Sequence, residues 1–551
     1  MIQDLLSIFA IEIQTLIKIN PKMLQIDLRK KGGYEWFSDG NIYVKGSALN
    51  DDSQLLSKED LLQHFKHITS EADFVASLKS LNGLFSVVIK TESGLMAAVD
   101  RNRNFPLLYT LNNDFFKLSD DYRSFLGEAS EIDTESEIGM IHIGWVPGKK
   151  TLIKNVFQIQ AGEYLIFTGD KIETKIWHHS ELCISKELNR DKWKAKLKEC
   201  FHVIGKRMCV QLNGRPVALP LSGGYDSRLI CLLLKMNGYN DVFCFTFGNK
   251  NSKEIANSKE IAKRLGYLWK FIDYEPYIGK KLDDIFTEYA QYAGNAISFP
   301  YIQEFYAVKT LKEIMNISKD VVVLPGHSGD TIGGAMYFPD LKSFKSAKVF
   351  FNRLRRIYGR NIIPNKAYQN ILYKLIKESV DPERLKSGCL AYDDWDIKEF
   401  QSKQLVNSAK IFDFFGYEYF LPLSDKDFLE LFYSMPLKNR VFKNLYDEVV
   451  KELFAEHNIL LEDEISQSQK ERERYYYRMK IREIFPFLTR LKKPKFRNSF
   501  FQFTELIQPM IKDVPSYKYK TQNGILSAWY TEVVKKTLSN QRLRLVSNTD
   551  T

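Results

Sequence analysis

The chain has 551 residues, a formal net charge of +11, 44% apolar residues and six cysteines. This length suits two large domains or several average ones, and the apolar content can bury proper cores, which excludes a disordered or fibrous protein. The sequence has no apolar run of about twenty residues, and its cysteines show no C-x-x-C pair or regular framework. We therefore expect a reduced, cytoplasmic protein with no transmembrane segment.

Three segments of the first 180 residues combine apolar strands with characteristic glycine and proline positions: residues 81–89, 100–109 and 144–162. Residues 100–109 read DRNRNFPLLY, and residues 144–162 begin with Gly-Trp-Val-Pro and end on Gly162. Together they resemble the glutaminase domain of the asparagine synthetase family. The resemblance implies that residues 1–180 form a layered α/β/β/α sandwich of the Ntn (N-terminal nucleophile) type.

The nucleophile of that domain is missing from the sequence. Family glutaminases use a cysteine at the mature N-terminus, whose thiolate attacks glutamine while the free α-amine serves as base. This chain begins Met1-Ile2-Gln3, and its first cysteine is Cys183. We predict a degenerate glutaminase domain that hydrolyses no glutamine and serves as a scaffold or a substrate-binding wall.

The most specific local pattern is Leu-Ser-Gly-Gly-Tyr-Asp-Ser at 221–227, between an apolar run at 217–221 and a helix-like run at 228–236. The first N–H groups of a helix have no intrahelical partner and favour an anion such as phosphate. Glycines let the backbone approach that anion, and Mg²⁺ prefers carboxylate and phosphate oxygens. The pattern predicts a nucleotide pyrophosphate site, with Asp226 also a magnesium ligand, formed by Leu221, Ser222, Gly223, Gly224, Asp226 and Ser227.

The S-G-G-x-D-S order resembles the pyrophosphatase loop (PP-loop) of the same family, whereas a Walker-type run is absent. Members of the family activate a carboxylate as an acyl-adenylate, release pyrophosphate and let an amine attack. The resemblance implies ATP and Mg²⁺ as cofactors. It also implies a parallel-sheet PP-loop ATPase domain, of the adenine nucleotide α-hydrolase-like type, at residues 190–470, with a helical extension at 471–551.

Two further buried strands are predicted at 242–248 and 321–325, and a helix at 254–265 is followed by Gly266. The resemblance implies that the strand ending near Phe247 contacts the adenine. The second strand leads into Gly-His-Ser-Gly-Asp at 326–330, which resembles the family's second signature, G-E-G-x-D-E. We expect Gly326 to line the nucleotide site and Asp330 to face Asp226 as the second magnesium ligand.

Two departures from this signature weaken the case for free aspartate and ammonia as the substrates. His327 stands where asparagine synthetases carry the first Glu, and Thr331 stands where they carry the second. Ring-closing relatives, such as β-lactam synthetase and the lasso-peptide cyclases, also replace the first Glu. The lasso cyclases carry G-H-G-G-D, which residues 326–330 resemble closely. An imidazole can take a proton from an attacking amine, so His327 is our candidate base.

Two later segments also resemble the family: residues 418–425, similar to E-x-R-x-P-F-L-D, and residues 469–471, similar to the end of R-Q-K-E. The second resemblance makes Lys470 a candidate for stabilising charge in the transition state. Lys470 also opens a basic tract at 470–497, with eleven Lys or Arg residues and three Glu. A charged helix surface explains this tract better than a nucleic-acid site, because no nucleic-acid-binding signature accompanies it.

Three functions remain open. In the first, the chain is an ATP-dependent amide-bond-forming ligase without its own glutaminase. It would join a small-molecule, glycan or peptide carboxylate to ammonia or an amine. Alternatively, it is a macrolactam cyclase of the lasso-peptide type, or a non-catalytic nucleotide-binding regulator. Asparagine biosynthesis from free aspartate stays possible, we expect no nucleic-acid partner, and a homodimer is possible.

Overall fold

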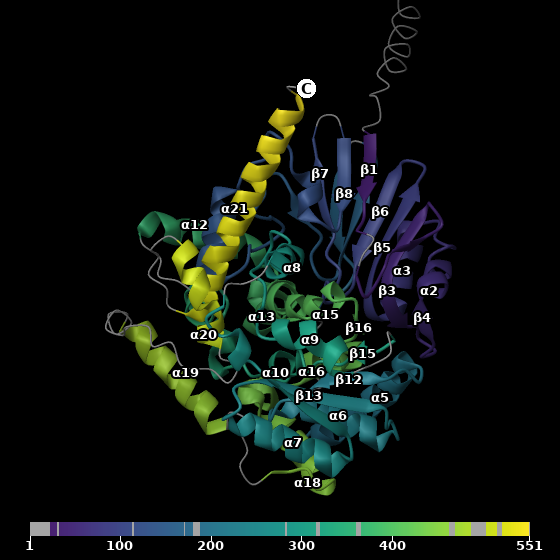
Figure 1. Ribbon diagram of the computed structural model, residues 1–551, viewed down its shortest axis with the longest axis vertical. Helices are drawn as coiled ribbons and strands as arrows, with labels where there is room; N and C mark the ends of the chain where they lie inside the picture. The colour runs from purple at the N-terminus through teal and green to yellow at the C-terminus, as the bar shows by residue number, and fades with distance from the viewer. Residues whose placement is uncertain are drawn as a thin grey trace, which may run out of the picture.

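The computed structural model describes residues 23–29, 32–112, 115–169, 171–179, 188–280, 284–315, 320–359, 365–461, 469–485, 503–514 and 521–549. Two sheets lie in its first 180 residues (Figure 1). The larger has the order β11-β10-β6-β5-β3-β2, with β4 paired to β3: β2 (Phe37–Ser38), β3 (Ile42–Leu49), β4 (Leu55–Ser57), β5 (Asn82–Thr91), β6 (Gly94–Val99), β10 (Glu163–Phe167) and β11 (Ile172–Ile176). The smaller has the order β1-β8-β7-β9: β1 (Met23–Asp27), β7 (Leu108–Leu111), β8 (Phe115–Ser119) and β9 (Phe157–Gln158).

These two sheets pack face to face. Apolar side chains of both form one buried cluster, in which the rings of Phe116 on β8 and Phe167 on β10 stack with centroids 4.3 Å apart. Helices α2 (Lys58–His64) and α3 (Glu71–Ser80) cover the other face of the larger sheet. The broad prediction of a mixed α/β fold is confirmed.

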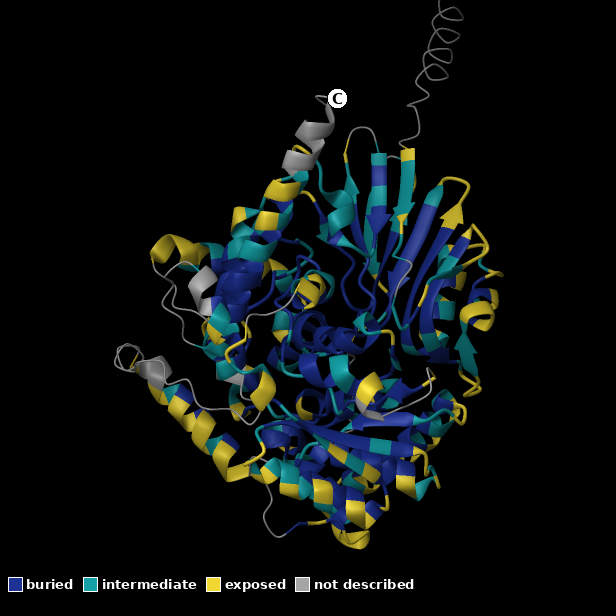
Figure 2. Cartoon of the chain, viewed as in Figure 1, coloured by how far each residue is buried: buried dark blue, intermediate teal, exposed yellow. Residues whose placement is uncertain are grey.

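A third sheet follows along the chain, and all of its strands are parallel. Its order is β14-β13-β12-β15-β16: β12 (Val217–Pro220), β13 (Val242–Gly248), β14 (Leu268–Asp273), β15 (Val322–Val323) and β16 (Glu418–Tyr419). Helices α6 (Tyr225–Met236) and α7 (Lys253–Leu265) lie below it in Figure 1, together with α18 (Asn444–Glu456). Its strands β12 and β13 are nearly continuous apolar runs, as expected for the inner strands of a parallel sheet covered on both faces (Figure 2).

The order of this sheet places a crevice beside β12. The chain adds β13 and β14 on one side of β12, and later adds β15 and β16 on the other side. The loops that leave β12 and β15 therefore diverge at the carboxyl ends of neighbouring strands, where open α/β sheets bind ligands. These two loops are the segments that the sequence singled out, 221–227 and 326–330.

The predicted elements around these loops are largely confirmed. β13 spans Val242–Gly248 as expected, and α7 ends at Leu265 because Gly266 adopts a left-handed φ of 73°. The strand expected at 321–325 is shorter, since only Val322 and Val323 pair in the sheet.

A buried ion pair joins the parts of the chain before and after residue 180. Glu399 and Lys403 lie on the π-helical segment η5 (Asp396–Leu405), and neither side chain has any exposed surface. Glu399 accepts hydrogen bonds from Trp145 Nε1 at 2.9 Å and from the backbone N–H of Gly148 at 2.9 Å. Lys403 Nζ donates to the carbonyl oxygen of Gly148 at 2.8 Å as well as to Glu399, so both charges are held across the boundary.

The remaining helices build the surroundings of the parallel sheet and the C-terminal region: α4 (Thr134–Ile143), α5 (Arg190–Leu212), α8 (Asp284–Gly294), α9 (Phe305–Met315), α10 (Gly329–Ile332), α11 (Ala347–Tyr358), α12 (Lys366–Ser379), α13 (Gly388–Trp395), α14 (Val406–Ser408), α15 (Lys410–Phe414), α16 (Lys426–Ser434), α17 (Leu437–Arg440), α19 (Gln469–Ile484), α20 (Phe503–Ile507) and α21 (Gln522–Thr549). Helix α19 exposes much of its length (Figure 2). Within the described ranges, none of the helices combines the length and apolar character needed to cross a bilayer.

Candidate nucleotide and acceptor site

The loop after β12 is held in shape by its own polar groups. Ser222 N–H donates to Ser227 Oγ at 3.1 Å, and Gly224 N–H donates to Ser222 Oγ at 3.1 Å. Gly224 is the N-cap of α6, so the free N–H groups of that helix face the loop. Fully buried Arg228 fixes the loop from below, because its Nη2 donates to the carbonyl oxygen of Gly223 at 2.7 Å.

The loop after β15 touches this first loop, which explains two of its glycines. A Cβ on Gly326 would lie 2.8 Å from Ser227 N, and one on Gly329 would lie 2.5 Å from Asp226 Cγ. Real Cβ atoms do not approach so closely, so both positions exclude a side chain. Between them, Ser328 adopts a left-handed φ of 75°, which is unusual for a residue other than glycine.

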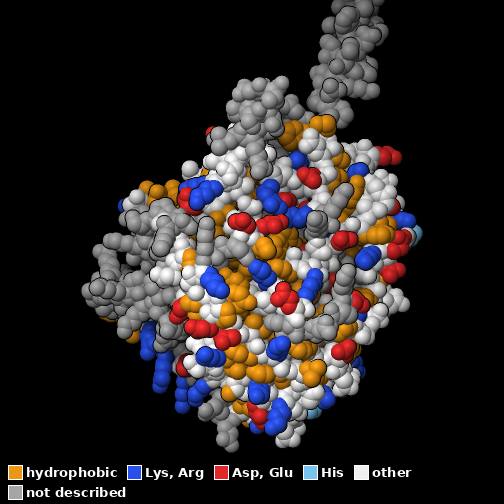
Figure 3. Space-filling view, viewed as in Figure 1, with side chains coloured by type: hydrophobic (Ala, Val, Ile, Leu, Met, Phe, Trp, Pro, Cys, Tyr) orange, Lys and Arg blue, Asp and Glu red, His pale blue; other side chains and the backbone are white. Residues whose placement is uncertain are grey.

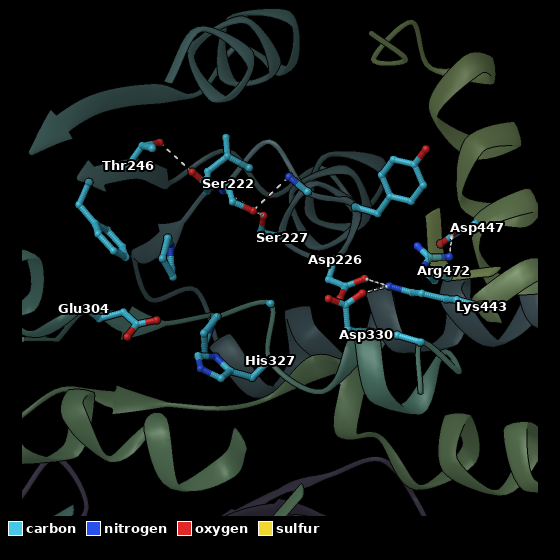
Figure 4. Close-up of a pocket in the computed structure, with 18 residues that line it drawn as sticks. Ser222, Asp226, Ser227, Thr246, Glu304, His327, Asp330, Lys443, Asp447 and Arg472 are labelled. Carbon is cyan, nitrogen blue, oxygen red and sulfur yellow. Dashed lines mark hydrogen bonds and ion pairs between the residues drawn. The ribbon is translucent and has the colours of Figure 1, made fainter. Parts of the chain in front are cut away.

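A lysine that we did not predict joins the two carboxylates (Figure 4). Lys443 Nζ donates to Asp226 Oδ1 at 2.9 Å and to Asp330 Oδ1 at 2.6 Å. Tyr446 Oη donates to the same oxygen of Asp226 at 2.8 Å. The two carboxylates that the sequence singled out therefore meet around one ammonium group.

The pKa values of these three charged groups shift in different ways. Burial raises the pKa of Asp226 to about 6, although Lys443 opposes that shift. The Lys443 ammonium lowers the pKa of Asp330, whose side chain is 76% exposed at the mouth of the pocket. Burial alone would lower the pKa of Lys443, but Asp226 and Asp330 outweigh it and raise the pKa. Lys443 is therefore a permanently charged cation at neutral pH.

The donor set fits magnesium bound together with a nucleotide. Mg²⁺ is usually held by one or two carboxylates and by substrate phosphates rather than by a cage of protein ligands. Asp226 and Asp330 supply two carboxylates close enough to share the Lys443 ammonium. In the part of the chain that the structure describes, no group of three or more His, Cys, Asp or Glu residues forms a separate metal site.

A pocket of about 440 Å³ opens over the two loops. Most of the residues predicted for the nucleotide site line it: Leu221, Ser222, Gly224, Asp226, Ser227, Phe247, Gly326, His327 and Asp330. Gly223 is not among its lining residues, because its N–H points away and donates to Glu254 Oε2 at 2.6 Å. Thr246 Oγ1 donates to the carbonyl oxygen of Leu221 at 2.7 Å and thereby ties β13 to the loop.

Two titratable side chains face this pocket at its other end (Figure 4). Burial lowers the pKa of His327 to about 4, and its Nδ1 has no hydrogen-bond partner among the described residues. Burial raises the pKa of Glu304 to about 7. His327 is thus a neutral imidazole at neutral pH, with a ring nitrogen available for a ligand. The sequence did not indicate Glu304 as a residue of the site.

Lys470 lies away from this pocket. It is an exposed residue in the first turn of α19 and does not line the pocket. Lys and Arg side chains gather where α19 meets the solvent (Figure 3), and the rest of the basic tract, 486–497, lies outside the described residues. The cation in contact with Asp226 and Asp330 is instead Lys443.

The residues that we missed carry a weak sequence signal. Lys443 is the N-cap of the helix that begins at Asn444, and Tyr446 and Asp447 lie in its first turn, so the three residues are close together. Arg472, one turn into α19, donates from Nη1 to Asp447 Oδ2 at 2.6 Å and also lines the pocket. Polar residues so close together could have indicated a site, but the helix carries other charged residues as well, and nothing local ties these three to Asp226.

Of the predicted degenerate glutaminase site, only part can be compared with the structure. Met1 to Gln3 and Cys183 lie outside the described residues. Arg103 occupies the glycine position of the resembling R-D-x-x-G segment; it is fully buried and adopts a φ of 57°. A large side chain therefore fills a place where the family pattern has none.

We predict that Gly329→Ala lowers the affinity for Mg–ATP at least about tenfold, because the new Cβ would displace Asp226 and small displacements at such sites cost large factors. Isothermal titration calorimetry measures the effect. The matched control is Gly127→Ala, where an added Cβ meets nothing within 4 Å. Equal affinities of the two variants would contradict close contact between the loops.

Comparisons with known proteins identify the family of this chain. The family model for asparagine synthase matches residues 207–495, just over half of the chain. A protein of Methanocaldococcus jannaschii named "Putative asparagine synthetase (glutamine-hydrolyzing) 2" is 22% identical over 379 residues, which cover 61% of this chain and 69% of that protein.

Among solved structures, one match is a glutamine phosphoribosylpyrophosphate amidotransferase from B. subtilis complexed with ADP and GMP. It is 13% identical, covers 54% of this chain and 58% of its own, and has a TM-score of 0.17, which carries no argument about the fold. The family assignment depends instead on the matched region 207–495, which contains both loops and Lys443. The chain belongs to the asparagine synthase family.

Proposed function

We propose that this protein is an ATP-dependent amide ligase that activates a carboxylate as an acyl-adenylate and transfers the acyl group to ammonia or an amine. One observation carries the proposal. Asp226 and Asp330, from the two loops at the carboxyl ends of β12 and β15, both contact Lys443. A cradle of helix N–H groups, two carboxylates and a buried ammonium suits a triphosphate that is to be cleaved.

In the proposed reaction, a carboxylate oxygen of the acyl donor attacks the α-phosphorus of ATP. The bond from that phosphorus to the bridging oxygen of pyrophosphate breaks. The N-terminus of α6, with Ser222 and Ser227, would hold the departing pyrophosphate. Asp226 and Asp330 would hold Mg²⁺, which neutralises phosphate charge when bound. The nitrogen nucleophile then attacks the acyl carbon, loses a proton, and AMP leaves.

Lys443 and His327 take separate roles in this proposal. The Lys443 ammonium lies against both carboxylates and inside the pocket, so it can stabilise negative charge that builds up on phosphate or acyl oxygens. Burial keeps His327 neutral, and its Nδ1, which has no partner among the described residues, can accept a hydrogen bond from the attacking amine. The same burial disfavours the imidazolium, so His327 would act by orienting the amine and sharing its proton in the transition state. We propose no role in catalysis for Lys470, because it lies outside the pocket.

The nitrogen source in this proposal is external, because the N-terminal region lacks a cysteine before Cys183. Ammonia from solution or an amine on a substrate would reach the acyl-adenylate at His327. A ring-closing reaction on a peptide remains a second candidate, favoured by the Gly-His-Ser-Gly-Asp loop and the imidazole at its second position.

The test is pyrophosphate exchange with purified protein, ATP, Mg²⁺, labelled pyrophosphate and pools of carboxylic acids. We expect exchange that depends on one pool of acids. In Asp226→Ala the exchange rate should fall about 10²-fold or more, because the variant lacks one of the two carboxylates that would hold Mg²⁺ against the phosphates. Asp241→Ala, an exposed aspartate at the opposite end of β13, is the control. ATP binding without exchange from any pool would contradict ligase activity and favour a nucleotide-binding regulator.

A further inference from the structure

A second pocket, of about 500 Å³, adjoins the nucleotide pocket. The two share one junction, formed by the same residues in both: Asp226, Gly326, His327, Asp330, Ala335 and Arg472. A molecule in the second pocket would therefore meet a nucleotide in the first at the candidate base and the candidate magnesium ligands. Two bound substrates would thus lie side by side at the junction, as a transfer between them requires.

The walls of the second pocket beyond the junction are mostly apolar. Met336, Phe400, Leu405 and Tyr475 line it, and Phe400 is only 9% exposed. Tyr475 comes from α19, and the centroid of its ring lies 6.3 Å from that of Phe338. The polar residues Ser328 and Thr331 also line the pocket.

Charges of both signs line the junction, because Arg472 lies there together with Asp226 and Asp330. Arg472 and Lys443 are both buried cations, and both line the nucleotide pocket. Arg472 reaches the second pocket as well. With Mg²⁺ held by Asp226 and Asp330, as proposed above, a carboxylate entering from the second pocket would face the metal ion and Arg472. The rest of the molecule would stay among apolar side chains.

We propose that the second pocket binds the acyl donor, and that this donor is a carboxylic acid with an apolar, aromatic or branched body rather than aspartate or a sugar acid. The inference rests on the proposed ligase function. A polyhydroxylated uronic acid, or the charged ammonium of aspartate, would leave polar groups without partners against Met336, Phe400 and Leu405, and each such group is costly. An apolar body gains by burial instead.

The test measures direct binding of three acids to the full chain loaded with Mg²⁺ and α,β-methylene ATP, which cannot react: 3-phenylpropanoate, aspartate and glucuronate. We expect 3-phenylpropanoate to bind at least tenfold more tightly than the other two. Met336→Trp fills the pocket and should weaken its binding at least tenfold. Met23→Trp, at a 60% exposed methionine on β1, is the matched control.

A second variant keeps the test valid if Met336→Trp does not fold. Tyr475→Ala removes a half-exposed ring from the pocket wall and should weaken 3-phenylpropanoate binding severalfold while the melting temperature stays unchanged. Tightest binding of aspartate or glucuronate, binding of none of the acids, or indifference of 3-phenylpropanoate to both variants would overturn the inference.

Pyrophosphate exchange on the same proteins separates this inference from the proposed function. Exchange driven best by aspartate would leave the ligase function standing and overturn the apolar pocket. Binding of 3-phenylpropanoate that depends on Met336, without exchange from any acid, would leave the pocket standing and contradict the ligase.

Discussion

Replacing Lys443 with methionine will lower pyrophosphate exchange about 10²- to 10³-fold at saturating ATP, as expected when one preorganised group that stabilises transition-state charge is removed. Lys443 is 2% exposed and contacts Asp226 and Asp330 within 2.9 Å. The loss should fall on the rate rather than on nucleotide binding, because Mg²⁺ can still neutralise both carboxylates. Exchange kinetics and calorimetric titration with ATP measure the two effects.

Two further lysines sharpen this experiment. Lys451→Met is the matched control, since Lys451 lies on α18, the helix that Lys443 caps, and is exposed. Among the described residues, its ammonium lies 5.7 Å from the centroid of the Tyr225 ring. Lys470→Met tests the assignment that the sequence suggested, and we expect less than a twofold change from it. A large loss in Lys470→Met together with a normal rate in Lys443→Met would reverse the two roles.

The nucleotide loops could be predicted from the sequence because their chemistry is local. Glycines, hydroxyls and one aspartate lie within seven consecutive residues at 221–227, and the strand before them and the helix after them follow from apolar periodicity. The second loop could be predicted in the same way, since residues 326–330 directly follow the apolar run at 321–325. The close contact that forces Gly329 to be a glycine was not visible, because it depends on how two neighbouring strands pair.

Lys443 could not be identified in the same way, because it lies 217 residues after Asp226 and no local pattern marks it. The chain has 79 Lys and Arg residues, so a lone lysine carries little information before folding. Resemblance placed the catalytic cation at Lys470, whereas packing of α18 against the loops brings Lys443 to the pocket. The apolar second pocket was also unpredictable, since Met336, Phe400 and Tyr475 meet only through tertiary packing.

The buried pair between Glu399 and Lys403 leads to the largest expected change in stability. Both side chains are fully buried, burial raises the pKa of Glu399, and burial lowers the pKa of Lys403 to about 8. Glu399→Ala would leave the Lys403 ammonium without its counter-charge, together with the unpaired N–H groups of Trp145 and Gly148. We expect a loss of about 3–5 kcal/mol in the free energy of unfolding, the usual cost of breaking a buried ion pair.

Urea unfolding followed by tryptophan fluorescence measures this loss, because Trp145 donates directly to Glu399. Glu383→Ala is the control: its partner is Lys386, both side chains are more than three quarters exposed, and such surface pairs contribute at most about 1 kcal/mol. The double variant Glu399→Met with Lys403→Met should recover only part of the stability, since it removes both charges but leaves Trp145 Nε1 and the Gly148 N–H unpaired. A Glu399→Ala variant as stable as Glu383→Ala would show that this ion pair does not hold the two parts of the chain together.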